Sequence, residues 1–270
     1  MGDQDKKFDG SIPDIYDEYL VPLIFEGFAQ DMASRVAALR PQRVLETAAG
    51  SGVVPRTLAP LLAAGAEYHV TDLNPPMLER AKSKQPAREN LLWQQADALD
   101  LPFQDNSFDV VCCQFGAMFF PNKQQGYSEA LRVLNDSGVF IFSVWDDIEE
   151  NEFADSVTET AGRFFPDDPP LFLRRTPHGF GDTNIIENDL RAVGFSEIDV
   201  HTLTKQSHAS SGQEPAIAFC QGTPLRGEIE ERDATLLEKI TKQAATDIEA
   251  KFGSGPVSGK IQGHVIVAYK

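Results

Sequence analysis

The chain has 270 residues, and its 41 Asp and Glu residues outnumber its 24 Lys and Arg residues, so the formal net charge is -17. A surface this acidic repels nucleic-acid phosphates and anionic membrane faces, so we expect neither as a partner. The fractions of hydrophobic (41%) and charged (24%) residues are typical of a soluble globular protein. We expect one domain with an insertion or cap.

The N-terminal segment MGDQDKKFDG contains no apolar stretch that would make a signal peptide. The central uncharged stretch that ends at Lys123 is too short to span a bilayer. Cys112 and Cys113 are adjacent in an apolar run, and the three cysteines of the chain have no metal-ligand spacing. We therefore predict reduced core thiols, no metal site and a cytoplasmic protein.

A strand–helix alternation follows an amphipathic helical segment over the first forty residues. The predicted strands are 43–47, 68–71, 90–95, 108–114 and 139–145. Three helices are predicted between them. The first ends near Leu62, the second begins at Asn74-Pro75-Pro76 and runs to Lys84, and the third covers 122–134. Strands and helices at this spacing predict a doubly wound α/β fold with a parallel sheet.

The alternation stops after Trp145, in a segment rich in Asp, Phe and Pro. A helix over 184–193 and strands over 195–204 and 263–269 complete the prediction. We predict the following organisation: an N-terminal helical lid (1–40), an α/β core (41–145), a cap insertion (146–183), a core helix and strand (184–204), a helical cap insertion (205–260) and a final core strand (261–270). The cap is expected over the strand ends, where open α/β sheets bind ligands.

Acidic and small residues follow the first three predicted strands. Glu46 ends the first strand and precedes the small-residue turn 47–52, a composition that lets backbone approach a ligand closely. Asp72 ends the second strand, where it can accept from both hydroxyls of a ribose. Asp97, followed by Ala98, comes after the third strand and can accept from an adenine amine. This arrangement predicts an adenosine site, which fits both NAD and S-adenosylmethionine.

Three details favour S-adenosylmethionine. The dinucleotide fingerprint G-x-G-x-x-G has Pro55 in place of its last glycine. Glu46 would repel a pyrophosphate but attract a sulfonium ligand with an ammonium group. No Tyr-x-x-x-Lys pair is present, since Tyr16 and Tyr127 are each followed four residues later by Leu. An NAD(P)-dependent oxidoreductase and a non-catalytic cofactor-binding protein remain the alternatives.

The run VLETAAGSG, Asp72, the pair Asp97-Ala98, and the stretches LPFQDNSFDVV and RVLNDSGVFIFSVW together resemble the class I S-adenosylmethionine-dependent methyltransferases. The resemblance is greatest to the small-molecule branch that includes the ubiquinone and menaquinone methyltransferases. It covers residues 43–145, and 184–204 with 261–270 fit the last helix and strands of that fold. It implies a Rossmann-like seven-stranded sheet with helices on both faces and a helical cap, with residues 41–145 binding the cofactor.

The motif of this family, D/E-x-G-x-G-x-G, falls on Glu46, Ala48, Gly50 and Gly52. Ala48 replaces the first glycine, which restricts the backbone angles there. The resemblance also implies that further residues hold the ribose, the adenine ring, the adenine amine and the methionine part of the cofactor. Asp72 would hold the ribose, and Leu73 with Met77 the adenine ring. Asp97 with Ala98 would hold the adenine amine, and Gln114 with Phe115 the methionine part.

Tyr16 and His178 are the candidate catalytic residues. Tyr16 lies on the apolar stripe of the first helix, where core packing is the alternative, and similar methyltransferases close an N-terminal tyrosine over the cofactor. His178 lies in a polar, turn-rich segment and is a candidate general base with a near-neutral pKa, with a structural role as the alternative. We predict methyl transfer by in-line displacement to a small organic acceptor, which the Phe-rich cap predicts to be hydrophobic or aromatic.

Overall fold

The computed structural model describes residues 12–270, so the first eleven residues of the predicted lid lie outside the described residues. The chain divides into two compact units. The unit that we call the sheet unit comprises Glu26–Val144, Asp182–Leu203 and His264–Lys270. The other, the helical unit, comprises 12–25, Trp145–Gly181 and Thr204–Gly263 of the described residues.

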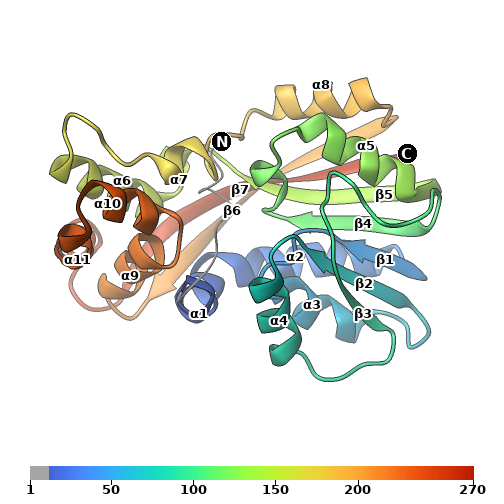
Figure 1. Cartoon of the computed structure of the whole chain (residues 1–270), viewed down its shortest axis with the longest axis horizontal. Helices are drawn as coiled ribbons and strands as arrows, with labels where there is room; N and C mark the ends of the chain where they lie inside the picture. Colours follow the sequence, from blue (N-terminus) through green and yellow to red (C-terminus); the bar gives the residue numbers. More distant parts are fainter. Residues whose placement is uncertain (1–11) are drawn as a thin grey trace. The chain divides into compact units, whose positions relative to one another are not determined.

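Seven strands form one sheet in the order β3-β2-β1-β4-β5-β7-β6 (Figure 1). They are β1 (Arg43–Glu46), β2 (Glu67–Asp72), β3 (Leu91–Gln95), β4 (Phe108–Gln114), β5 (Leu134–Trp145), β6 (Glu197–Ala209) and β7 (Val257–Tyr269). The first five strands pair in parallel. The strand order reverses between β1 and β4, and open α/β sheets bind their ligands at the carboxyl ends of strands at such a point.

Strand β7 runs antiparallel to β5. The Asp146 N–H donates to the Gln262 carbonyl (3.1 Å), and the Lys270 N–H donates to the Gly138 carbonyl (3.1 Å). Residue numbers therefore fall along β7 as they rise along β5, which is the antiparallel pattern. The sheet is mixed, and the predicted seven-stranded sheet flanked by helices is confirmed.

The sheet unit contains five α-helices among its described residues. They are α2 (Glu26–Ala38), α3 (Val53–Leu58), α4 (Pro75–Lys84), α5 (Lys123–Val133) and α8 (Thr183–Val193), with the short 3-10 helices η3 (Ala59–Leu61) and η4 (Ala117–Phe119). Helix α4 begins at the predicted prolines, which need no N–H partner in a first helical turn. Helix α8 ends at Gly194, whose φ of 115° suits a glycine that terminates a helix.

The sequence predicted Asn135-Asp136-Ser137-Gly138 to be a turn before a strand, but the structure includes these residues in β5. Phe108 pairs with Leu134 and Val110 pairs with Val139, so the pairing with β4 shifts around this segment. The Asn135 side-chain amide donates to Asp109 Oδ1 (2.6 Å). The segment is thus an irregularity within one strand.

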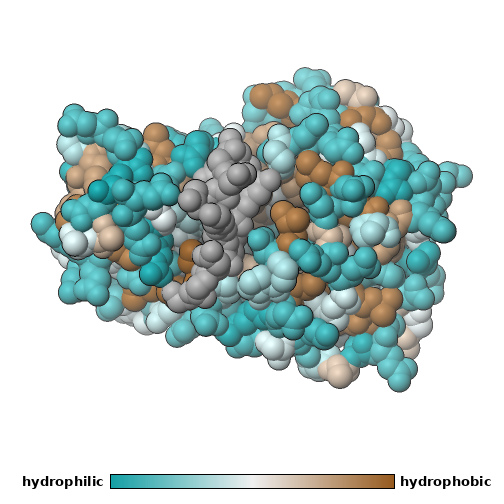
Figure 2. Space-filling view, viewed as in Figure 1, coloured by the Kyte–Doolittle hydropathy of each residue, from teal (hydrophilic) through white to brown (hydrophobic). Residues whose placement is uncertain are grey.

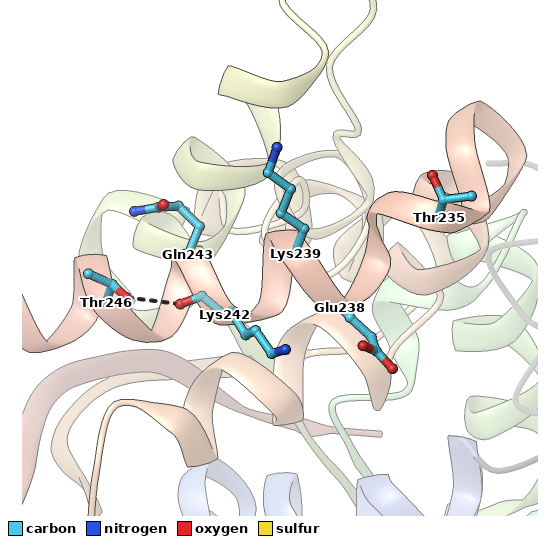
Figure 3. A pocket seen from close by; sticks show the side chains of 6 residues that line it. All are labelled: Thr235, Glu238, Lys239, Lys242, Gln243 and Thr246. Carbon is cyan, nitrogen blue, oxygen red and sulfur yellow. Dashed lines mark hydrogen bonds between the residues drawn. The ribbon is translucent and has the colours of Figure 1, made fainter.

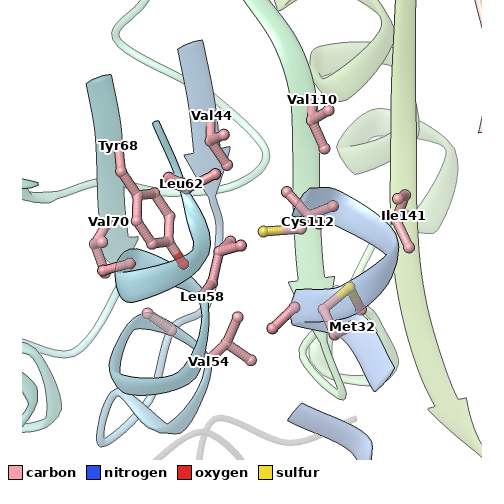
Figure 4. Close-up of a cluster of buried hydrophobic side chains, with 14 of the residues drawn as sticks. Met32, Val44, Val54, Leu58, Leu62, Tyr68, Val70, Val110, Cys112 and Ile141 are labelled. Atoms are coloured by element: carbon pink, nitrogen blue, oxygen red, sulfur yellow. The ribbon is translucent and has the colours of Figure 1, made fainter. Parts of the chain in front are cut away.

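Buried apolar side chains from α2, α3 and the central strands form the core of the sheet unit (Figure 4). Those labelled there are Met32, Val44, Val54, Leu58, Leu62, Tyr68, Val70, Val110, Cys112 and Ile141. Cys112 and Cys113 are buried free thiols, as predicted.

Helix α2 clusters with the sheet unit, although the sequence placed it in the lid (1–40). The reason is its apolar face. Phe28 packs edge-on against Phe115 at 5.1 Å between ring centroids, and Met32 enters the core of the sheet unit. Helix α2 is thus part of the sheet unit, and the helical lid predicted over 1–40 remains a prediction.

The helical unit contains helices from three separate parts of the chain. They are α1 (Ile12–Ile15), the π-helical η2 (Tyr16–Phe25), η5 (Ile148–Glu150), α6 (Glu152–Phe164), α7 (Phe172–Arg175), α9 (Gln213–Gln221), α10 (Leu225–Asp233), η6 (Ala234–Leu236) and α11 (Leu237–Phe252). Helix α11 packs against α9 and α6. Among residues 12–270, none of the helices is long and apolar enough to cross a membrane. The face drawn in Figure 2 is largely hydrophilic.

Candidate functional site

The loop 47–52, which we call the β1 loop, joins the carboxyl end of β1 to α3. The Thr47 N–H donates to the Cys112 carbonyl of β4, and the Ala49 N–H donates to the Thr71 carbonyl of β2, each at 3.0 Å. These bonds tie the loop to the strands on both sides of β1. The loop therefore lies at the edge of the sheet where ligands of this fold class bind.

Three residues of the β1 loop have positive φ angles: 53° at Ala48, 56° at Gly50 and 83° at Gly52. Glycine adopts this left-handed region without the Cβ clash that other residues meet. The restriction predicted at Ala48 is present in the structure. A Cβ at Gly52 would also lie 2.7 Å from the Cβ of Ala81 in α4, so this glycine allows a close approach.

Asp72 connects the end of β2 to the β1 loop. Its Oδ2 accepts from the Gly50 N–H at 2.8 Å, and its Oδ1 accepts from the Asn74 N–H at 2.7 Å. Burial raises the pKa of Asp72, and the two backbone bonds oppose that rise. Each carboxylate oxygen has a further lone pair, so Asp72 can accept from ligand hydroxyls while it holds the loop.

Glu46 is the last residue of β1 and is only 1% exposed. Its Oε2 accepts a hydrogen bond from the Tyr68 hydroxyl of β2. Burial raises the pKa of Glu46 to about 8, and the bond from Tyr68 opposes the rise. The sequence identified Glu46 by its position at the strand end but gave no indication of Tyr68. Tyr68 lies two residues before Val70, the residue that pairs with Glu46 in β2. A tyrosine at this position in a strand is the signal that could have identified the partner of Glu46.

The residues that the sequence predicts to contact the adenine differ in their exposure to solvent. Leu73 is 42% exposed, whereas Met77 is buried with its Cε 3.8 Å from the position that a Cβ on Gly50 would take. Asp97 is exposed, and its Oδ1 accepts from the Leu99 N–H at 2.9 Å, as a turn carboxylate does. Ala98, beside it, is half-buried.

Gln114 and Phe115 lie at the carboxyl end of β4. Phe115 has a φ of 53°, and its N–H donates to both the carbonyl (3.1 Å) and the Oγ (3.2 Å) of Ser143 in β5. Gln114 is half-buried. The bonds to Ser143 fix the direction in which the chain leaves β4, next to the β1 loop.

Gly116, which the sequence did not single out, brings the end of β4 against the β1 loop. A Cβ on Gly116 would lie 2.4 Å from the Cβ of Ala48 and 2.8 Å from the Sγ of Cys113. Side chains do not approach so closely, so Gly116 must lack one if Ala48 has one. The two positions are matched in size.

Tyr16 and His178 belong to the helical unit, whereas the other predicted site residues belong to the sheet unit. Tyr16 is half-buried and stacks on Phe25, with ring centroids 5.1 Å apart. His178 is buried, and its Nδ1 lies 2.9 Å from the Asp146 carbonyl oxygen. Burial lowers the pKa of His178 to about 4, so the near-neutral pKa expected from the sequence is wrong.

The described residues of the helical unit line at least two cavities. One is a small cavity of about 10 Å³, lined by Ile24, Trp145, Asn151, Ala154, His178, Phe219 and Ile261. Another is a surface pocket of about 390 Å³ on η6 and α11, lined by Thr235, Glu238, Lys239, Lys242, Gln243 and Thr246 (Figure 3). Near this second pocket, Lys239 Nζ lies 5.5 Å from the centroid of the Phe164 ring.

The β1 loop contains a polar atom that lacks a partner. The hydroxyl of Ser51 is buried and has no hydrogen-bond partner in the structure. Buried polar atoms normally have partners, and a polar ligand held by the loop could supply one. Together with the glycines and Asp72, this atom fits an adenosyl ligand with a polar tail. Among residues 12–270, no group of three or more His, Cys, Asp or Glu side chains could hold a metal ion.

The sequence pattern of the methyltransferase domain family matches residues 45–142. The chain is 28% identical over 184 residues to the demethylmenaquinone methyltransferase of Clavibacter sepedonicus, covering 63% of this chain and 71% of that one. It covers 44% to 46% of the length of further curated relatives.

Two solved structures share the fold. The YcgJ protein of Bacillus subtilis superposes with a TM-score of 0.57 at 20% identity, covering 90% of this chain and 98% of that one. Phosphoethanolamine N-methyltransferase 2 of Haemonchus contortus, solved in complex with S-adenosyl-L-methionine, superposes with a TM-score of 0.59 at 17% identity, covering 98% and 58%. Residues 45–142 therefore match a methyltransferase domain, and the chain has the fold of solved methyltransferase structures.

Proposed function

We propose that the carboxyl ends of β1, β2 and β4 bind S-adenosylmethionine, whose methyl group passes to a small organic acceptor. The proposed binding residues are Glu46, Ala48, Gly50, Gly52, Asp72, Leu73, Met77, Asp97, Ala98, Gln114 and Phe115. The observation that carries the proposal is the bond from the Gly50 N–H to Asp72 Oδ2. It joins the glycine-containing loop to the acid that would take the ribose hydroxyls.

The residues of the site would bind and orient the two reactants. The bound cofactor supplies a methyl group on a sulfonium sulfur, which the acceptor attacks in line with the departing sulfur. Asp72 would hold the ribose hydroxyls, and Leu73 with Met77 would pack against the adenine ring. The buried Phe115 would exclude water near the methionine part of the cofactor. Alignment and exclusion of water then account for most of the rate acceleration.

The proposed roles of Tyr16 and His178 concern the acceptor side. Tyr16 would cover the bound cofactor, and His178 would accept a proton if the acceptor must lose one. At neutral pH the low pKa of His178 keeps its ring neutral, and a ring that donates from Nδ1 to the Asp146 carbonyl has Nε2 as its proton acceptor. A base with a pKa near 4 would take the proton of a phenol, whose pKa is near 10, only as the bond to the methyl carbon forms.

Acceptor screening tests the proposed substrate class. The whole protein is incubated with methyl-labelled S-adenosylmethionine and panels of phenolic and enolic compounds, charged metabolites, peptides and nucleic acids. We expect label only in the apolar and aromatic small molecules, which is consistent with relatives named demethylmenaquinone methyltransferases. Labelling only of charged compounds, peptides or nucleic acids would overturn this part of the proposal.

A further inference from the structure

A buried hydroxyl–carboxyl pair lies where β1 leads into the β1 loop. Tyr68 and Glu46 are each 1% exposed, and the Tyr68 hydroxyl donates to Glu46 Oε2. In the parallel pairing of β1 with β2, Tyr68 lies opposite Val44, so its ring extends along the strands to Glu46. The Thr71 hydroxyl donates to the main-chain oxygen of Glu46 at 2.8 Å. The acid is therefore held by β2 at both its main chain and its side chain.

The charge on Glu46 depends on its surroundings. The titratable and charged groups that face it are Tyr68 and Asp72 from β2, Cys112 and Cys113 from β4, and Arg56 from α3. Burial disfavours the charged carboxylate, and Asp72 adds to that effect. Tyr68 and Arg56 favour the charged form. Because Tyr68 is itself buried and its pKa is raised, its hydroxyl keeps its proton and stays a donor.

We propose that Tyr68 is a positioning residue for cofactor binding: its hydroxyl stabilises the negative form of the Glu46 carboxyl, which favours a cationic ligand at the β1 loop. This inference rests on the proposed function. A cationic ligand binds better when the carboxyl is charged, so binding releases a proton from Glu46. Without the Tyr68 hydroxyl, that proton is harder to release.

Tyr68→Phe tests the proposal because it keeps the ring and removes only the hydroxyl. Calorimetric titrations with S-adenosylmethionine and S-adenosylhomocysteine are run between pH 6 and 9. In the unsubstituted protein, we expect the affinity to rise with pH as Glu46 loses its proton. In Tyr68→Phe, we expect the midpoint of that rise to move up by about one pH unit and the affinity at pH 7 to fall about tenfold.

Two control variants separate this role from simple support of the fold. Thr71→Val removes the bond to the main-chain oxygen of Glu46 and leaves the side-chain pair, so its pH midpoint should match that of the unsubstituted protein. Glu46→Gln should abolish the pH dependence of binding. An equal loss of affinity at every pH in Tyr68→Phe, or an unmoved midpoint, would overturn the proposal.

Failure of the proposed function gives a different result. If the unsubstituted protein binds neither ligand at any pH, the cofactor assignment fails. The pair is then followed in the protein alone by carbon-13 NMR of the glutamate carboxyl carbons, with the Glu46 signal identified by its loss in Glu46→Gln. A higher titration midpoint for this signal in Tyr68→Phe supports the control of charge by Tyr68. The same midpoint in both proteins overturns it.

Discussion

Ala48 is the residue at which this chain departs from the glycine-rich motif D/E-x-G-x-G-x-G. Its φ of 53° is unfavourable for any residue with a Cβ, by about 1–2 kcal/mol. Ala48→Gly removes that strain but makes the unfolded chain more flexible, which offsets about 0.4–1 kcal/mol of the gain. We expect a free energy of unfolding that is unchanged or up to about 1.6 kcal/mol higher, measured by urea denaturation.

The neighbouring Ala49 provides the matched control. It is buried and does not have a positive φ, so Ala49→Gly gains nothing from the greater freedom of glycine. We expect it to lower the free energy of unfolding by about 1 kcal/mol. Equal losses in the two variants would show that the left-handed angle at Ala48 carries no strain.

At the scale of elements, the start of α3 and the side of α4 meet at Gly52. The φ of 83° and the 2.7 Å between a Cβ at Gly52 and the Ala81 Cβ both oppose a side chain there. We expect Gly52→Ala to lower the free energy of unfolding by about 2–4 kcal/mol. Gly65→Ala is the control, because a Cβ there meets nothing within 4 Å. If thermal or urea denaturation shows equal effects, close packing at Gly52 is not the cause.

How far the elements could be predicted depends on how local their causes are. The start of α4 at Asn74-Pro75-Pro76 was readable because proline chemistry acts within one helical turn. The assignment of α2 to the sheet unit depends on the contact between Phe28 and Phe115, which are far apart in the chain.

Prediction of the candidate site also depended on how local each cause is. Asp72 could be placed from its position at a strand end, but its bond to the Gly50 N–H required the folded loop. The neutral, buried state of His178 could not be seen from its polar, turn-rich segment, because other parts of the helical unit bury it. Position in the sequence could suggest candidate residues such as Asp72, whereas the burial and charge of His178 depended on residues far along the chain.

At the scale of the whole molecule, His178 makes stability depend on pH. Its folded pKa of about 4 lies below the usual value of 6.5, so the unfolded chain binds more protons between these pH values. Its contribution is complete above pH 6.5 and is lost as the pH falls towards 4, by up to about 1.4 kcal/mol per pH unit. We expect His178→Gln to make the acid loss of unfolding free energy shallower than in the unsubstituted protein.

The solvent-exposed His201 is the matched control for this prediction. Urea denaturation at several pH values between 4 and 7 gives the unfolding free energy of each protein. His201→Gln should keep the acid loss of the unsubstituted protein. If the unfolding free energy of His178→Gln falls equally steeply with pH, the burial of His178 does not control the loss of stability in acid.

We propose above that the β1 loop and Asp72 form a site for S-adenosylmethionine. A thermal-shift titration with S-adenosylmethionine, S-adenosylhomocysteine and NAD(P) tests it most directly, since a ligand at 100 times its dissociation constant adds about 2.7 kcal/mol to the folded state. We expect both sulfur compounds to raise the melting temperature of the unsubstituted protein and of the exposed-surface variant Asp136→Asn, and to raise that of Asp72→Asn much less. A rise with NAD(P) alone, or an equal rise in Asp72→Asn, would contradict the account.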